Sequence, residues 1–511
     1  DAIETRTDPR GVVTTFGYDA LNRLNSISYN TVSGVRTSAP LSFTYKLSSP
    51  GKGAVETITD SAGTESFSYD SLGRLSTRSR TITGNSNTYT TSYEYNPAGQ
   101  LSALVYPSGK RVRYNYDDRG RPTGMDKMSG STVLLSYLSA IGYNQAGQVT
   151  GLSLGSNLSE SYDYDSARLQ LTRQRAIRSG TTLLDLNYSY QSAAGVGTTS
   201  GNSGQLMAIT AASTVNGEMR EESYSYDTLG RLVTRVGWGG GQRRFDYDRW
   251  GSRSGVWNTH QSGFGQQIQT ASIKETTPGS GIPTNQLSSI TNRNGNTSAT
   301  LAHSYDLSGN LTNDGQHSYK YDSEGRIAVV DEGSGQVASY SYDLANRRVK
   351  RVVAGVATYY IWDGGQVIAE YSDSPAPQVN GGGLRYYVAD RLSTRMVLDS
   401  SGIVKGTQEH RAFGEEAFSS GELEKHRFTN YDRDSESGTD YAVNRQYSQG
   451  SGRFLQPDIF TGDTFDPQTL NRYSYGYNDP VNMYDPDGQI AFAVAGVILV
   501  GGGLLGGVLG A

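Results

Sequence analysis

A seven-residue pattern, Tyr-Asp-x-x-Gly-Arg-Leu, recurs along the chain and constrains its fold more than any other feature. It is complete at 69–75 and at 226–232, and looser copies begin at Tyr18, Tyr95, Tyr116, Tyr143, Tyr164, Tyr247, Tyr305, Tyr321 and Tyr342. The intervals 95 to 116, 143 to 164, 226 to 247 and 321 to 342 are each 21 residues. A fixed short period indicates an array in which one supersecondary unit stacks on the next.

Each copy of the pattern predicts one β-hairpin. In Glu222–Asp227 polar and aromatic residues alternate, as in a strand with two unlike faces. Gly230 permits the positive φ of a tight turn, and Leu232–Val236 alternates again as the returning strand. The tyrosines fall on one face, where we expect them to stack on those of neighbouring repeats. A single hairpin is marginally stable in water, so stability must come from adjoining repeats.

The composition supports an ordered β array. Of the 511 residues only 35% are hydrophobic, yet 36 are tyrosine and 63 are glycine, against 12 phenylalanines. Disordered chains are poor in aromatic and β-branched residues, so an extended, solvent-exposed β array is favoured over disorder. The longer intervals between copies, such as 164 to 226, predict degenerate repeats and surface loops.

Charge and residue types exclude several classes of function. The net charge is -5 and Arg and Lys are scattered singly, which predicts no nucleic-acid partner. The absence of cysteine excludes disulfides and thiolate metal sites. No phosphate-binding or dinucleotide motif is present, so we expect no cofactor. Metal catalysis is also not expected, because no metal-ligand spacing links His260, His303, His317, His410 and His426.

The last 22 residues, Ile490–Ala511, differ from the rest because they carry no charge. They are long enough to span a membrane, and pairs such as Gly502 and Gly506 have the spacing of close helix packing in lipid. Two interpretations stay open: membrane contact through 490–511, or an apolar plug buried in the protein. The chain begins in mid-repeat without Met, so we expect it to be a piece of a longer polypeptide.

Between residues 427 and 489 the aspartates gather in longer strings. Segment 427–441 is Arg-Phe-Thr-Asn-Tyr-Asp-Arg-Asp-Ser-Glu-Ser-Gly-Thr-Asp-Tyr, 452–458 is Gly-Arg-Phe-Leu-Gln-Pro-Asp, and 478–488 is Asn-Asp-Pro-Val-Asn-Met-Tyr-Asp-Pro-Asp-Gly. The repeats resemble those of the RHS/YD-repeat family, and these strings resemble that family's associated core domain. The resemblance covers nearly the whole chain to residue 489.

The resemblance implies an all-β fold, with a large spiralling array of YD-repeat hairpins that forms a hollow shell over residues 1–383. The RHS-associated core domain, 384–489, would cap the shell, and 490–511 would be the hydrophobic, Gly-rich start of a C-terminal cargo. In this family the core domain acts as an aspartic autoprotease that cuts after the residue following its final Asp-Pro-x-Gly.

By position, the resemblance implies that Asp458 and Asp485 are the catalytic carboxylates and Arg445 the supporting cation, with cleavage between Gln489 and Ile490. Two carboxylates held close together push their pKa values apart, as acid–base hydrolysis of a peptide requires. Taken singly, each aspartate adjoins a proline and is also typical of a turn. Gln489 stands where the family usually has leucine, and no Asp-Pro-x-Gly-Leu follows at Asp458, which predicts slow or absent cleavage.

The function implied is that of a bacterial toxin shell, secreted or at the cell surface, which encloses its C-terminal effector and releases it by a single intramolecular cut. Its partners would be that effector and a toxin-delivery or secretion apparatus. One alternative is a non-cleaving cell-surface adhesion or carbohydrate-binding protein whose tyrosines stack on sugars. Another is a structural wall protein whose core domain is only a cap.

Overall fold

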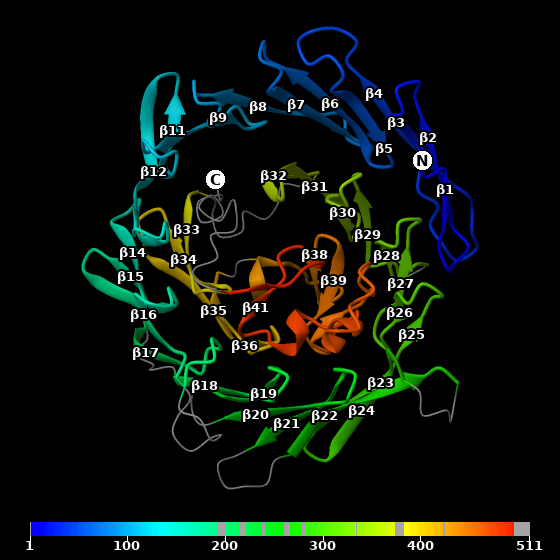
Figure 1. The fold of residues 1–511 in the computed structure, drawn as a ribbon, viewed down its shortest axis with the longest axis vertical. Coiled ribbons are helices and arrows are strands. Elements are labelled where there is room, and N and C mark those ends of the chain that lie inside the picture. The colour runs from blue at the N-terminus through cyan, green and yellow to red at the C-terminus, as the bar shows by residue number, and fades with distance from the viewer. Residues whose placement is uncertain are drawn as a thin grey trace. The chain divides into compact units, whose positions relative to one another are not determined.

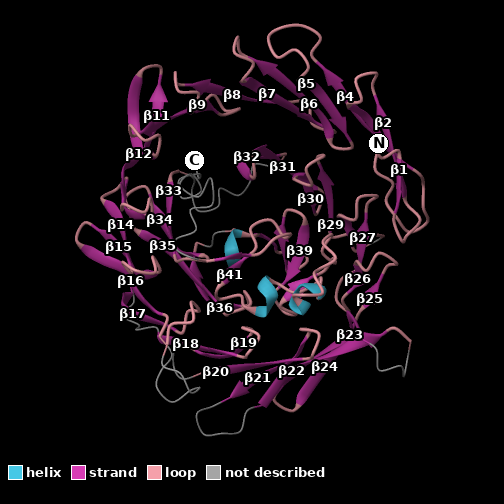
Figure 2. Cartoon of the chain, viewed as in Figure 1, coloured by secondary structure: helices cyan, strands magenta, loops and turns pink. Residues whose placement is uncertain are grey.

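The structure is a computed structural model and is almost entirely β-strand (Figures 1 and 2). It describes residues 2–191, 201–214, 221–237, 241–259, 266–277, 283–333, 335–373, 383–422 and 425–494. Helix in these ranges is confined to short 3-10 turns, namely η3 (Phe428–Asn430), η4 (Pro467–Leu470) and η5 (Gly476–Asn478). The all-β prediction is confirmed.

The strands follow one another with short connections. The first twelve are β1 (Thr5–Thr7), β2 (Val13–Tyr18), β3 (Leu24–Tyr29), β4 (Leu41–Tyr45), β5 (Val55–Asp60), β6 (Gly63–Tyr69), β7 (Leu75–Ile82), β8 (Thr88–Tyr95), β9 (Leu101–Val105), β10 (Arg111–Tyr116), β11 (Pro122–Ser129) and β12 (Thr132–Tyr143). The next twelve are β13 (Val149–Leu154), β14 (Leu158–Tyr164), β15 (Leu171–Arg178), β16 (Thr181–Ser189), β17 (Ala208–Thr214), β18 (Glu221–Tyr226), β19 (Leu232–Val236), β20 (Gln242–Tyr247), β21 (Arg253–Thr259), β22 (Gln266–Glu275), β23 (Pro283–Asn294) and β24 (Thr297–Ala302).

The remaining strands form smaller sheets. The pair β25 (Ser304–Tyr305) and β26 (Leu311–Asn313) precedes a six-stranded sheet of β27 (Tyr319–Tyr321), β28 (Ile327–Val330), β29 (Ala338–Tyr342), β30 (Arg348–Val353), β31 (Val356–Asp363) and β32 (Gln366–Ser372). Two four-stranded sheets follow, with β33 (Arg385–Ala389), β34 (Thr394–Asp399), β35 (Val404–His410) and β36 (Glu416–Gly421), then β37 (Asp432–Asp434), β38 (Thr439–Ala442), β39 (Arg445–Ser448) and β40 (Arg453–Phe454). The last pair is β41 (Met483–Tyr484) and β42 (Phe492–Ala493).

Neighbours in the chain are neighbours in the sheet, because the strands pair antiparallel as successive hairpins. The register shifts by one residue at the tyrosine of the repeated pattern, for example between Ser68 and Tyr69 and between Ser225 and Tyr226. Such a bulge increases local twist and turns the strand end toward the connection. The prediction of one hairpin per pattern is therefore confirmed.

The aspartate of each pattern closes the hairpin turn. Asp70 Oδ1 accepts hydrogen bonds from the N–H groups of Leu72 and Arg74, each at 2.9 Å. Asp70 Oδ2 accepts one from Arg74 Nε at 2.7 Å. Gly73 has a φ of +77°, a conformation in which glycine carries no steric cost. One carboxylate thus satisfies two backbone donors and a guanidinium.

Tyrosine and arginine then join one turn to the next. Tyr95 Oη donates to the carbonyl of Leu75 at 2.8 Å, and the guanidinium of Arg74 lies 4.5 Å from the centre of the Tyr95 ring. Tyr247 makes the same two contacts, with the carbonyl of Leu232 and with Arg231. We expected these tyrosines to stack on one another. Instead, the rings of Tyr95 and Tyr247 each pack against the arginine of the preceding turn, because the turn aspartate holds that arginine over the ring.

The interval from 164 to 226 contains strands although it lacks the pattern. β15 and β16 pair over most of their length, and β16 pairs with β17. This agrees with the prediction of degenerate repeats in that interval.

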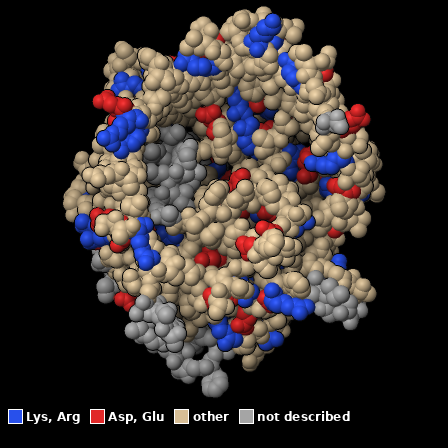
Figure 3. Space-filling model, viewed as in Figure 1, with Lys and Arg blue, Asp and Glu red and all other residues tan. Residues whose placement is uncertain are grey.

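By its internal contacts the chain divides into two compact units, and each is described by itself. The first comprises Asp1–Ser139, Asp306–Thr312 and His317–Asn380; the second comprises Ala140–Tyr305, Asn313–Gln316 and Gly381–Ala511. The boundary at 383/384 between shell and core domain stays a prediction. On the face seen in Figure 3, basic side chains are scattered among acidic ones.

The hydroxyl bonds of the repeat tyrosines should contribute to stability according to their burial. Tyr342 is buried and its Oη donates to the Ile327 carbonyl at 2.8 Å, whereas the bond from Tyr18 Oη to the Ile3 carbonyl is exposed. Tyr342→Phe leaves a buried carbonyl unpaired, so we expect a loss of about 1–2 kcal/mol in the free energy of unfolding, measured by urea denaturation. Tyr18→Phe is the control and should change it little; equal losses would contradict this account.

Candidate active site

The candidate site lies in the second unit, on sheet β37–β40 and the loops after it. The sheet and the segments packed against it form a cluster of buried side chains: Phe428, Tyr431, Ala442, Tyr447, Phe454 and Tyr475. The ring centre of Tyr447 is 5.3 Å from that of Tyr475 and 5.6 Å from that of Phe454. Close packing of this kind fixes β39, and with it Arg445 at the start of that strand.

Arg445 brings the two predicted carboxylates together. Its Nη2 lies 3.0 Å from Asp458 Oδ2 and 3.3 Å from Asp485 Oδ2. The three side chains are buried, with exposed fractions of 6% for Arg445, 14% for Asp458 and 3% for Asp485. Two acids therefore share one guanidinium nitrogen in a region of low solvent access.

The rest of the guanidinium is held by the surrounding backbone. Arg445 Nε donates to the carbonyl of Gly488, and Nη1 donates to the carbonyl of Arg472 at 3.0 Å. The Cζ atom of Arg445 lies 3.7 Å from the centre of the Phe454 ring. Burial lowers the pKa of Arg445, but an arginine stays charged in proteins.

Asp485 faces the predicted cleavage site. Its Oδ1 accepts hydrogen bonds from the N–H groups of Gly488, at 2.8 Å, and Gln489, at 3.0 Å. Burial raises the pKa of Asp485 to about 6; Arg445 opposes this shift and the charge of Asp487 adds to it. A carboxyl group that holds its proton close to neutral pH can act as an acid.

Asp458 follows the last strand of the same sheet. Its N–H donates to the Arg472 carbonyl at 2.8 Å, and Arg472 Nε donates back to the Asp458 carbonyl at 2.6 Å. Oδ1 accepts the N–H of Phe460 at 3.0 Å, which leaves Oδ2 directed to Arg445. Both aspartates thus close turns, as their neighbouring prolines suggested, and both also contact the arginine.

The predicted cleavage site lies between two fixed segments. Gln489 is half-buried and bonded through its N–H to Asp485, whereas Ile490 is 47% exposed. Two residues later the chain joins β42, which pairs with β41. All five residues predicted from the sequence therefore lie in one place.

Three further residues were missed by sequence reasoning. Tyr431 Oη donates to the Asp485 carbonyl, and the N–H of Asp485 donates to Tyr475 Oη at 3.4 Å. Arg472 holds the backbone of Asp458 on the other side. Tyr431 belongs to the 427–441 string that resembles the core domain, but a string does not show which of its residues meet.

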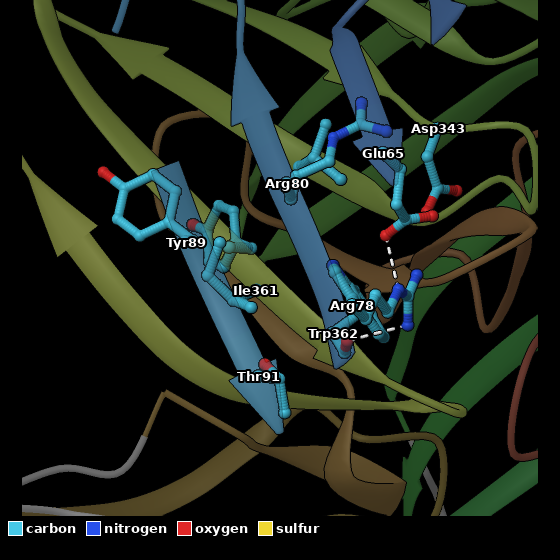
Figure 4. A pocket seen from close by; sticks show the side chains of 10 residues that line it. Glu65, Arg78, Arg80, Tyr89, Thr91, Asp343, Ile361 and Trp362 are labelled. Atoms are coloured by element: carbon cyan, nitrogen blue, oxygen red, sulfur yellow. Dashed lines mark hydrogen bonds and ion pairs between the residues drawn. The ribbon is translucent and has the colours of Figure 1, made fainter. Parts of the chain in front are cut away.

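The first unit contains a separate small pocket (Figure 4), lined by charged and aromatic side chains that include Glu65, Arg78 and Arg80. Arg78 pairs with Glu65 and donates to the Trp362 carbonyl at 2.9 Å. Arg80 forms a two-bond ion pair with Asp60, at 2.7 and 2.9 Å. Paired charges of this kind hold neighbouring strands together, and we assign the pocket a structural role.

The described ranges contain no group of three or more histidine, aspartate or glutamate side chains placed to hold a metal ion. They also contain no helix that is long and apolar enough to cross a membrane. His260 and residues 495–511, part of the predicted membrane-contacting segment, lie outside the described residues.

Two sequence models of known families match parts of the chain. The teneurin YD-shell matches residues 18–143, and the RHS repeat matches residues 321–355. The tRNA3(Ser)-specific nuclease WapA of Bacillus spizizenii is 30% identical over 37% of this chain. The tRNA nuclease WapA of Bacillus subtilis strain 168 is also 30% identical over 37% of it. In both cases the match covers 9% of the relative's length.

Solved structures show the same fold. The crystal structure of TcdB2-TccC3-TEV matches with a TM-score of 0.75 and 18% identity, over 95% of this chain and 27% of the other. TcdB2-TccC3-Cdc42 matches with a TM-score of 0.75, over 94% of this chain and 27% of the other. Together with the repeats, the two family models confirm the resemblance to RHS/YD repeats over residues 18–143 and 321–355, and the solved structures show that the fold is shared.

Proposed function

We propose that this chain forms the shell of a toxin-type protein, encloses its own C-terminal effector and frees it by one intramolecular aspartyl cut between Gln489 and Ile490. The observation that carries the proposal is that Asp458 and Asp485 meet on Arg445, which also binds the carbonyl of Gly488, the residue before Gln489. Asp485 also accepts the N–H of Gln489 itself.

The reaction consumes one water molecule. Asp458, as the carboxylate, takes a proton from water while the water oxygen attacks the carbonyl carbon of Gln489. Asp485, as the acid, gives its proton to the carbonyl oxygen. When the tetrahedral intermediate collapses, Asp458 gives the proton that it took from water to the nitrogen of Ile490 as the C–N bond breaks, and Asp485 takes a proton back from a hydroxyl of the intermediate. The products are a carboxylate at Gln489 and an amine at Ile490.

The environments of the two acids support this assignment of roles. Asp485 is the more buried, and burial raises its pKa to about 6, so that it holds its proton below about that pH. Asp458 is the more exposed, and its Oδ2 lies closer to Arg445 Nη2, at 3.0 Å against 3.3 Å for Asp485. Because Arg445 also fixes the Gly488 carbonyl, it holds the acids and the substrate backbone in one geometry.

The cargo would begin at Ile490 and continue through the apolar segment. The WapA relatives are tRNA nucleases, and TccC3 is part of the Photorhabdus luminescens Tc holotoxin, which supports an effector as cargo and a secreted or cell-surface location. Delivery would need a secretion or toxin-delivery apparatus as partner. The shell domain (1–383), the core domain (384–489) and the cargo segment (490–511) are part of this proposal.

No observation favours adhesion through tyrosines. The repeat tyrosines Tyr95 and Tyr247 are half-buried, with one face against an arginine and the hydroxyl bonded to the backbone. Sugar stacking requires a free aromatic face.

Removing either carboxylate should stop cleavage. In a chain expressed with its natural sequence beyond Ala511, we expect Asp458→Asn and Asp485→Asn each to slow cleavage at least about a hundredfold, because each removes a proton donor or acceptor. Denaturing gel electrophoresis measures the fraction cut. Asp463→Asn is the matched control, since Asp463 lies in the same region and caps the N–H of Phe465 without touching Arg445.

The wild-type chain should give two bands under these conditions. A single intact band, or cutting at the wild-type rate in both aspartate variants, would contradict the proposed function.

Cleavage should also depend on pH. If Asp485 must be protonated, the rate should be high below about pH 6 and fall roughly tenfold per pH unit above it. The stability of the fold should also decrease with pH. Because the folded state holds this proton more tightly than the unfolded chain, the free energy of unfolding falls as pH rises from 3.8 to about 6. The cleavage rate is measured after newly synthesised chain is transferred to buffers of pH 5–8.

Asp440 provides the control for this experiment. Burial raises its pKa to about 6 as well, but it pairs with Arg433 and not with Arg445. Asp440→Asn should therefore leave the midpoint of the rate unchanged. A rate that rises with pH would contradict the acid role of Asp485.

A further inference from the structure

The chain beyond the predicted cleavage site is already held as a strand. β42 pairs antiparallel with β41, with Met483 opposite Ala493 and Tyr484 opposite Phe492. The N–H of Val494 donates to the carbonyl of Asn482 at 2.7 Å. The ladder therefore joins 482–484, just before Asp485, to 492–494, just after the bond to be cut.

The two sides of the bond are fixed by different groups. Before it, Arg445 Nε binds the Gly488 carbonyl and Asp485 Oδ1 binds the N–H of Gln489. After it, the first fixed residues are those of the ladder. The Gln489–Ile490 bond therefore lies in a loop that contains Asp485 and whose two ends, 482–484 and 492–494, are paired with each other.

The ladder is tied in turn to the repeat strands by the side chain of Asn482. Its Oδ1 accepts the N–H of Leu206 at 2.7 Å, and its Nδ2 donates to Tyr226 Oη at 2.9 Å and to the carboxylate of Asp479. Tyr226 Oη donates to the Leu206 carbonyl at 2.7 Å. Tyr226 is the tyrosine of a complete repeat pattern, so a repeat residue helps to hold the substrate.

We propose that residues 482–484 form the binding strand for the leaving side of the substrate, and that Asn482 and Tyr226 are its positioning residues. This inference rests on the proposed function. Recognition is through the backbone, since the side chains of Ile490 and Phe492 are 47% and 55% exposed. The site should therefore accept different cargo sequences at these positions, provided that a strand can form.

The first experiment removes one ladder hydrogen bond. Val494→Pro deletes the N–H that binds Asn482, so we expect cleavage to slow by about tenfold or more through misplacement of the bond. Ala493→Pro is the matched control, because donors alternate along an antiparallel strand and the N–H of residue 493 points away from β41.

The second experiment acts from the repeat side. Tyr226→Phe removes the hydroxyl that holds both Asn482 and Leu206, and we expect cleavage to slow by about threefold or more. Tyr247→Phe removes the equivalent hydroxyl bond one repeat later, to the Leu232 carbonyl, without touching Asn482. Tyr247→Phe should therefore cut at the wild-type rate. If Tyr226→Phe slowed cleavage only through a general loss of stability, both variants would cut slowly.

The pH profile separates positioning from acid–base chemistry. In Val494→Pro and Tyr226→Phe the rate should fall while its midpoint stays near pH 6, because Asp485 is unchanged. If the wild-type chain cuts and both variants cut equally fast, this inference is wrong and the aspartyl mechanism stands. If the wild-type chain does not cut, the proposed function itself is wrong. If Val494→Pro does not fold, the comparison of Tyr226→Phe with Tyr247→Phe tests the inference.

Discussion

The structure depends on one interaction, repeated along the chain: an aspartate that closes a hairpin turn and binds the arginine four residues later. Asp70 and Asp227 each bind two backbone N–H groups and one guanidinium. The arginine then covers the next repeat's tyrosine, whose hydroxyl returns to the backbone. The polar groups of these turns find their hydrogen-bond partners within the repeats themselves, so a chain with few hydrophobic residues can still form an extended ordered sheet.

The candidate site uses the same contacts with a different charge balance. In the two complete patterns Asp70 and Asp227 each have an arginine of their own, and in the looser copy at Tyr18 the N–H and guanidinium of Arg23 lower the pKa of Asp19. At the candidate site Asp458 and Asp485 also close turns, but both contact the same arginine, Arg445. One carboxylate is then in excess in a buried place, and burial raises the pKa of Asp485. The same turn-closing contacts thus place a carboxyl group with a raised pKa beside a second acid, because one arginine serves both.

Local features were predictable from the sequence and distant contacts were not. The turn at Gly230 and the alternation of Glu222–Asp227 follow from rules that act within a few residues, and the hairpins formed as expected. The site residues were named by resemblance, but their meeting on one nitrogen joins segments 40 residues apart. The bond between Asn482 and Tyr226 spans 256 residues, and no local pattern predicts it. Tyrosine stacking was expected from facing side chains, yet arginine took that place.

The central claim is that a buried carboxylate pair cuts the chain at one peptide bond while the folded protein still holds both pieces. Intact mass spectrometry of the purified protein, extended beyond Ala511, tests this most directly. The account predicts one particle under native conditions and two masses after denaturation, with Gln489 ending one fragment and Ile490 beginning the other. A single denatured mass, or a break at another bond such as Asp485–Pro486, would contradict it.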